Sequence, residues 1–194
     1  MLFSLLLAIT APFDYYMFAR SWAPTVPNAS REAFVIHGLW PNWDNGSWPS
    51  YCDNTTLNQT AIRSLQPDMI THWTDTTTFS KANVAFWNHE WTKHGTCSGH
   101  TQLQYFAVAL WVGMRIDPNL ALQNANLAPS ATQAYPKTLL ETILQASLYC
   151  DPPDTLAELR IEVSRDFAHS QMVSTPSTCT DMIYLRPLEV SRIS

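Results

Sequence analysis

Two short segments of the chain concentrate the side chains that could do acid–base chemistry. The first, residues 34–41, carries His37 next to Gly38 and Trp40. The second, residues 86–97, carries four ionisable side chains: His89, Glu90, Lys93 and His94. At about 100° per residue, those four fall within an arc of about 140° on a helix. Because such a face is costly to bury without a partner, the pattern predicts a functional cluster.

Three familiar chemistries fit this cluster poorly. A zinc site of the His-Glu-x-x-His type needs histidines four residues apart, whereas His89 and His94 are five apart and Lys93 would oppose a dication. No Gly-x-Ser-x-Gly occurs, so a serine nucleophile is not indicated. The chain has five glycines and no glycine-rich run, which excludes a dinucleotide or phosphate loop. We therefore expect no metal and no cofactor.

Phosphoryl transfer within RNA fits the cluster better. One neutral imidazole can remove the proton of a ribose 2′-OH, and one imidazolium can protonate the leaving 5′-oxygen. A histidine pKa of about 6.5 suits both roles near neutral or mildly acid pH. Cations stabilise the charge that develops on the phosphorane oxygens. DNA lacks the 2′-OH and is not an expected substrate.

The elements that must position these residues do not alternate regularly between strand and helix, which favours an α+β fold over a doubly wound parallel sheet. Strands are expected at residues 13–18, 33–36, 156–163 and 182–185. Helices are expected at residues 61–73 with an interruption at Pro67, 83–94 with Gly95 as C-terminal cap, 102–116 and 135–149. Residues 41–58 are predicted to form a long loop.

Size and charge limit the function further. The chain has 194 residues, the size of one ordinary domain, and a net charge of −5. That charge argues against a protein that coats nucleic acid through a broad basic face, although it permits an enzyme that reads one phosphate. No apolar stretch approaches the roughly 20 residues that a membrane span needs.

Three features predict an oxidising compartment. Residues 1–11 resemble the apolar part of a secretory signal, with a buried first strand as the alternative, and residues 12–194 are predicted to be a single domain. Four cysteines without a Cys-x-x-Cys motif allow three disulfide pairings. Four glycosylation sequons crowd one region, at Asn28, Asn45, Asn54 and Asn58. We expect an extracellular, vacuolar or lysosomal protein.

At the two histidine segments the sequence resembles the ribonuclease T2 family of secreted, acid, metal-independent endoribonucleases, which includes plant self-incompatibility-type ribonucleases. Residues 37–41, His-Gly-Leu-Trp-Pro, look like the first active-site segment, and residues 89–97 look like the second. Weaker similarity extends over most of the chain. The resemblance implies a central, mainly antiparallel sheet flanked by helices. It also implies cleavage of single-stranded RNA through a 2′,3′-cyclic phosphate, and we expect a monomer.

The resemblance also implies a role for each residue of the two segments. His37 and His94 would form the acid–base pair, with His94 as the base in the first step. Glu90 and Lys93 would stabilise the pentacoordinate intermediate, and His89 would hold the phosphate.

Further positions follow from the same resemblance. Trp40 and Trp48 would stack on bases, and Asn42 stands where some members have an acid that favours adenine. The family pattern implies two disulfides: Cys52–Cys97 and Cys150–Cys179.

Two binding functions compete with the enzyme. A secreted binding protein on the same fold would act without catalysis, and the richness in tryptophan together with low charge would also suit a carbohydrate-binding module. A substitution of His37 by Ala separates the first of these from an enzyme, because only the enzyme would lose its function.

Overall fold

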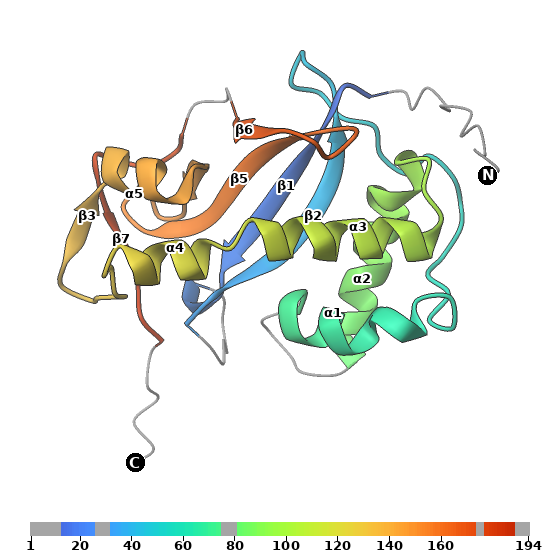
Figure 1. Ribbon diagram of the computed structural model, residues 1–194, viewed down its shortest axis with the longest axis horizontal. Coiled ribbons are helices and arrows are strands. Elements are labelled where there is room, and N and C mark those ends of the chain that lie inside the picture. The colour runs from blue at the N-terminus through green and yellow to red at the C-terminus, as the bar shows by residue number, and fades with distance from the viewer. Residues whose placement is uncertain (1–12, 26–31, 75–80, 174–176, 189–194) are drawn as a thin grey trace, which may run out of the picture.

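The computed structural model describes residues 13–25, 32–74, 81–173 and 177–188, and its α+β architecture confirms the expected fold class (Figure 1). Five antiparallel strands form the larger sheet in the order β2-β1-β5-β4, with β6 also paired to β5. Their bounds are β1 Tyr15–Trp22, β2 Phe34–Asn42, β4 Ser147–Cys150, β5 Leu156–Ser164 and β6 Ser170–Met172. A second sheet pairs β3 (Ala134–Pro136) with β7 (Met182–Tyr184). The apolar segment 1–11 and Asn28 lie outside the described residues.

Helix α3 (Gln102–Arg115) crosses one face of the larger sheet, as Figure 1 shows. It begins at a capping box, in which the Thr101 side chain accepts from the Gln104 backbone N–H. The helix lies close to the sheet at Gly113, where a Cβ would sit 2.7 Å from Cδ1 of Ile36. This contact fixes the buried face of the sheet, so the histidine cluster must lie at an edge or on the opposite face.

The helix that was expected at residues 83–94 is α2 (Lys81–Lys93). Gly95 was expected to cap this helix at its C-terminus, and it does lie just beyond the helix end, but it begins a 3₁₀ turn over Gly95–Cys97 and its φ is not positive. A Cβ at Gly95 would collide with Cε3 of Trp91. Close packing, and not backbone conformation, therefore explains the glycine at this position.

Pro67 was expected to interrupt a helix, and the structure corrects this. A 3₁₀ turn at Arg63–Leu65 is followed by α1 (Gln66–His72), and Pro67 lies in the first turn of α1. A proline at that position loses no hydrogen bond, because the first N–H groups of a helix have no partner within it. Pro67 therefore lies in the first turn of a helix and does not interrupt one.

The expected helix at residues 135–149 is also corrected. Only Lys137–Leu144 is helical (α5), since Gln145 adopts a left-handed conformation with φ of 50° and β4 follows. Four elements besides the 3₁₀ turns were not expected: the short strands β3, β4 and β6, and helix α4 (Pro118–Asn124). Helix α4 begins where the Asp117 carboxylate accepts from the backbone N–H groups of Asn119 and Leu120.

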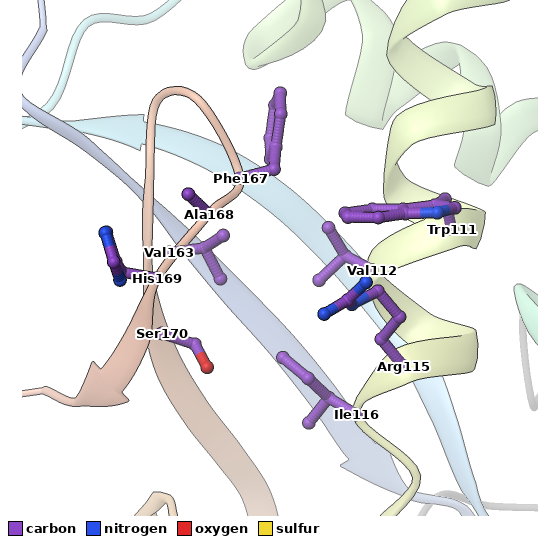
Figure 2. Close-up of a pocket in the computed structure, with 9 residues that line it drawn as sticks. All are labelled: Trp111, Val112, Arg115, Ile116, Val163, Phe167, Ala168, His169 and Ser170. Atoms are coloured by element: carbon purple, nitrogen blue, oxygen red, sulfur yellow. The ribbon is translucent and has the colours of Figure 1, made fainter.

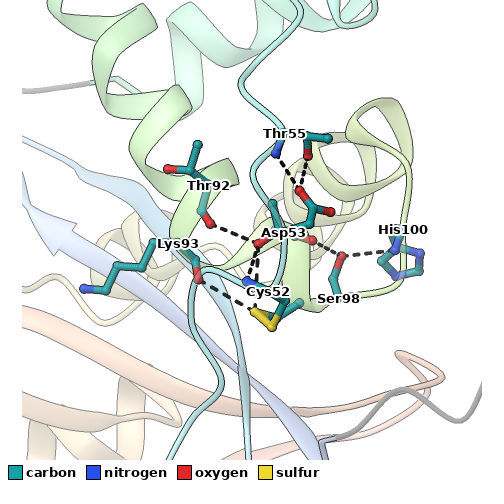
Figure 3. The surroundings of a disulfide bond; sticks show 10 residues. Cys52, Asp53, Thr55, Thr92, Lys93, Ser98 and His100 are labelled. Atoms are coloured by element: carbon teal, nitrogen blue, oxygen red, sulfur yellow. Dashed lines mark hydrogen bonds between the residues drawn. A yellow bond between two sulfur atoms is a disulfide. The ribbon is translucent and has the colours of Figure 1, made fainter.

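Both disulfides implied by the family pattern are present, Cys52–Cys97 and Cys150–Cys179. The first ties the loop after β2 to the turn that follows α2 (Figure 3). Two hydrogen bonds support it: Tyr51 N donates to the backbone carbonyl of Lys93 at 3.0 Å, and Cys52 N donates to the side-chain Oγ1 of Thr96 at 3.1 Å. In the chain-entropy model, closing a loop of this length contributes about 4 kcal/mol to the free energy of unfolding.

Among the helices of the described ranges, none combines the length and the apolar character that crossing a bilayer requires.

Candidate active site

His37 occupies a β-bulge in strand β2. Ala19 of β1 pairs with Gly38 and Arg20 pairs with Ile36, so His37 is the extra residue between two pairs. A bulge bends the strand locally and redirects a side chain, and bulges are common beside active sites. The indole N–H of the buried Trp73 donates to the backbone carbonyl of His37 at 2.8 Å and so holds the bulge from behind.

The His37 imidazole is paired with a carboxylate from another strand. His37 Nδ1 lies 2.5 Å from Oε2 of Glu158 on β5, and Arg160 Nε donates to Oε1 of Glu158 at 2.6 Å. Burial favours a lower pKa for His37, but the hydrogen bond and charge of Glu158 outweigh it and raise this pKa above its ordinary value. Burial likewise favours a higher pKa for Glu158, and His37 and Arg160 outweigh it, so that this pKa is lowered.

Glu90 of α2 reaches β2 next to the bulge, at Gly38 and Trp40. Its carboxylate is 1% exposed, and Oε2 accepts from Nε1 of Trp40 at 2.8 Å. A Cβ at Gly38 would collide with both of these atoms, so the glycine is required by their close approach. Burial raises the pKa of Glu90 to about 7, against the opposing effects of His37, the Trp40 hydrogen bond and Lys93.

His94 follows the last turn of α2 and is 5% exposed. Its Nδ1 is buried and has no hydrogen-bond partner among the described residues. Burial, together with the charges of Lys93, His89 and His37, lowers the pKa of His94 to about 3. The imidazole is therefore neutral across the mildly acid and neutral range, and it can accept a proton.

The Trp40 indole contacts both imidazoles. Its ring centroid lies 4.9 Å from that of His37 and 5.2 Å from that of His94. The structure thus gathers His37, Glu90 and His94 around one tryptophan. Of the four side chains that helical spacing groups together, Glu90 and His94 are buried, Lys93 is half-buried and His89 is exposed.

Lys93 and His89 border this cluster. Lys93 is half-buried, and His89 is exposed. Partial burial and then the charges of Lys93 and His37 lower the pKa of His89. Lys93 and His37 are thus close enough to His89 and His94 to lower the pKa values of both of these imidazoles. Such a group of cationic or potentially cationic side chains suits an anionic ligand.

The other predicted substrate contacts lie apart from the cluster or are covered. Asn42 is 5% exposed at the end of β2, whereas Trp48 is 55% exposed in the following loop. Three sequon asparagines are exposed in the described chain: Asn45, Asn54 and Asn58.

Sequence reasoning did not assign Glu158, Arg160 or Phe86 to the site. Glu158 and Arg160 contact the histidine cluster as described above, and the Phe86 ring centroid lies 5.9 Å from that of His37. The available signal for Glu158 and Arg160 was the presence of charged residues at the outward positions of an otherwise apolar strand. No spacing rule links those positions to His37, because the contact is made across the sheet.

A separate cavity of about 130 Å³ lies between α3 and the hairpin that joins β5 to β6 (Figure 2). Trp111 and Arg115 line it from the helix, with the guanidinium 4.7 Å from the indole centroid, and Phe167 and Ser170 line it from the hairpin. None of the predicted site residues lines this cavity. The candidate active site is therefore the histidine cluster, where His37, Glu90 and His94 come together around Trp40.

Comparison with known proteins identifies the family. Residues 13–175 match the sequence model of the Ribonuclease T2 family. Ribonuclease DdI of Dictyostelium discoideum is 35% identical over an alignment that covers 63% of this chain and 59% of that protein. Intracellular ribonuclease LX of Solanum lycopersicum is 34% identical, with 64% and 58% covered. The chain thus spans about three fifths of the length of these two relatives.

Solved structures share the fold over nearly their whole length. RNase NT in complex with 5′-AMP superposes with a TM-score of 0.82 and 26% identity, covering 91% of this chain and 99% of that one. Ribonuclease MC1 from bitter gourd seeds gives a TM-score of 0.78 and 27% identity, with 89% and 100% covered. With the sequence model matching most of the chain and the same fold around the two histidine segments, the chain belongs to the ribonuclease T2 family.

Proposed function

We propose that this protein is a metal-independent endoribonuclease that cleaves single-stranded RNA by transphosphorylation through a 2′,3′-cyclic phosphate. One observation carries the proposal: the Trp40 ring contacts the imidazoles of both His37 and His94. Two imidazoles held around one side chain can act on the two oxygens of a single phosphodiester. The relatives named as ribonucleases support the same activity.

The proposed roles of the two histidines follow from their surroundings. His94 is neutral because its pKa is lowered to about 3, so it removes the proton of the 2′-OH. His37 has a raised pKa and donates a proton to the leaving 5′-oxygen. A bound phosphodiester anion raises the pKa of both groups and brings that of His94 toward the range of an effective base.

Glu90, Lys93 and His89 are proposed to stabilise the charged states of the reaction. A Glu90 pKa of about 7 means that the carboxyl group is protonated at acid pH, where it can donate a hydrogen bond to a phosphorane oxygen. The Lys93 ammonium stabilises the negative charge directly, and the exposed His89 contacts the phosphate. The protein is selective for RNA because the nucleophile is the ribose 2′-OH of the substrate, which DNA lacks.

Base contacts are proposed for Trp40, Trp48 and Asn42. The exposed indole of Trp48 can stack on a base, since stacking needs an open ring face. Trp40 is half-buried and can offer only part of its ring. Asn42 is buried, so in this state its contribution is limited to shaping the end of β2.

We further propose that the protein enters the secretory pathway and functions as a monomer with a single domain over residues 12–194. Its two disulfides support an oxidising compartment. The proposed signal segment is residues 1–11, and the proposed glycosylation sites are Asn28, Asn45, Asn54 and Asn58. One tomato relative is named an intracellular ribonuclease and another an extracellular ribonuclease. For this protein we propose secretion, or retention in a vacuole or lysosome.

The test is to incubate the purified protein with single-stranded RNA and matched DNA in excess EDTA, from about pH 4 to pH 8. We expect RNA cleavage with cyclic-phosphate ends, intact DNA and a bell-shaped pH profile. Absence of cleavage throughout that range by folded, disulfide-bonded protein would contradict the enzyme. It would favour the non-catalytic binding protein, whose ligand binding should survive the substitution His37→Ala.

A further inference from the structure

A buried, ionised carboxylate lies directly against His37. Glu158 is 6% exposed, and each of its two oxygens has a partner: Oε2 faces His37 Nδ1 at 2.5 Å, and Oε1 accepts from Arg160 Nε at 2.6 Å. An ionised carboxylate has only lone pairs to offer, so the proton between Nδ1 and Oε2 belongs to the imidazole. The pair therefore determines which nitrogen of neutral His37 carries hydrogen.

The strand register explains how this contact forms. Glu158 pairs with Ser21 of β1, and Arg160 pairs with Ala19, so both charged residues project from the face of the sheet that lies opposite α3. Paired residues share a face, and the two β1 residues between β5 and β2 have small side chains. The space above β1 thus allows the imidazole from the bulge to meet the carboxylate from β5.

We propose that Glu158 is a positioning residue for His37. It keeps hydrogen on Nδ1 and so leaves Nε2 to exchange a proton with the substrate, while Arg160 holds the carboxylate in place. This inference rests on the proposed function, in which His37 is the general acid. In the cleavage step the Nε2–H bond breaks and an O–H bond forms on the leaving 5′-oxygen, while Nδ1–H stays bonded to Glu158. A carboxylate that orients an imidazole in this way is a recurrent device in acid–base catalysis.

The other charged groups that face His37 do not replace Glu158. From β5 there is Arg160, which opposes protonation of His37, and from α2 there is Glu90. Because the pKa of Glu90 is about 7, its carboxyl group is mostly neutral at acid pH. The remaining groups on or next to α2 are basic: His89, Lys93 and His94. At acid pH, Glu158 is therefore the lasting negative charge beside His37, because its own pKa is lowered.

The experiment is an NMR titration of His37 in the wild-type protein, in Glu158→Gln and in Glu162→Gln. Glu162 is a matched control, since it lies on the same strand and the same face and its Oε1 accepts from Gln171 Nε2. We expect Glu158→Gln to lower the pKa of His37 by about 1 unit or more. The neutral imidazole should also lose its preference for hydrogen on Nδ1. Glu162→Gln should leave both properties unchanged.

Activity gives a second readout. Glu158→Gln should lower kcat/KM by about tenfold or more, and the alkaline limb of its pH profile should move to lower pH by the shift that NMR measures. If Glu158→Gln does not fold, Glu158→Asp retains the charge but withdraws it by one methylene, and it should also lower the pKa of His37. An unchanged pKa and tautomer of His37 in a folded Glu158 variant would overturn the proposal. Because the titration needs no substrate, it decides the role of Glu158 even if the wild-type protein does not cleave RNA.

Discussion

Trp40 Nε1 donates a 2.8 Å hydrogen bond to Oε2 of Glu90 and thereby joins the two segments that carry the candidate catalytic histidines. The two residues are fifty positions apart in sequence, one on β2 and the other on α2. The same indole contacts His37 and His94 through its ring faces and edges. One side chain therefore sets the spacing between strand and helix at the site.

Replacing Trp40 with Phe should destabilise the protein and reduce its activity. The change removes the N–H donor from a buried carboxyl group, and an unsatisfied buried acceptor costs about 1–3 kcal/mol. Urea unfolding measures the loss of stability, and an RNA cleavage assay measures the loss of activity. The control is Trp48→Phe, because Trp48 is exposed. Equal stabilities of the two variants would show that the Trp40–Glu90 bond does not hold the segments together.

Glu90→Gln should become more stable relative to the wild type as pH rises. The pKa of Glu90 is about 7 in the folded protein and near its ordinary value of 4.5 when unfolded. Between those values the folded state holds a proton that the unfolded state has lost, so the free energy of unfolding of the wild type falls as pH increases. Glutamine does not titrate, so the variant lacks this dependence. The free energy of unfolding of Glu90→Gln relative to that of the wild type should therefore grow with pH by an amount on the order of 3 kcal/mol.

Urea unfolding of both proteins at each pH provides the measurement. The lowered pKa of His94 works in the opposite direction, because the unfolded state then binds the additional proton and stability rises with pH. Comparing two proteins that both contain His94 largely cancels this contribution. A stability difference that stays constant from about pH 4 to pH 8 would mean that the pKa of Glu90 is the same in the folded and unfolded states, which would contradict the raised value.

Gly38→Ala should abolish most activity. The new Cβ would collide with Trp40 Nε1 and Glu90 Oε2, so the hydrogen bond between them must break or the strand must shift. Overpacking of this kind costs about 1–3 kcal/mol. Gly46→Ala is a useful comparison, because Gly46 has open space around it and a φ of 83°. That variant should lose stability through backbone strain while its RNA cleavage persists, and retention of full activity by Gly38→Ala would refute the packing argument.

Much of the site could be predicted from sequence because its residues are close along the chain. Helical spacing alone groups His89, Glu90, Lys93 and His94 on one face, and Glu90 and His94 lie together in the structure. Residues 34–41 singled out His37 by composition, but only the resemblance to the family paired it with His94, because no local periodicity connects residue 37 to α2.

The contacts that sequence could not predict depend on tertiary structure. Glu158 meets His37 only because a bulge in β2 redirects the imidazole across β1. Gly95 and Gln145 show the same limit at helix ends. A close ring contact explains Gly95, and a non-glycine residue adopts the left-handed conformation that ends α5. Local propensity favours particular residues at the ends of helices, but tertiary packing determines which conformation the chain adopts there.

The most direct test of the account compares His37→Ala and His94→Ala on two ribonucleotide substrates, one with a 5′-nucleoside and one with p-nitrophenol as leaving group. A good leaving group departs without protonation, so it reduces the need for a general acid but not for a general base. We predict that both variants lose about 10²- to 10⁴-fold in kcat/KM on the nucleoside substrate. On the p-nitrophenyl substrate only His37→Ala should recover most of the loss. Recovery by His94→Ala instead, or by both variants equally, would contradict the assignment of His37 as acid and His94 as base.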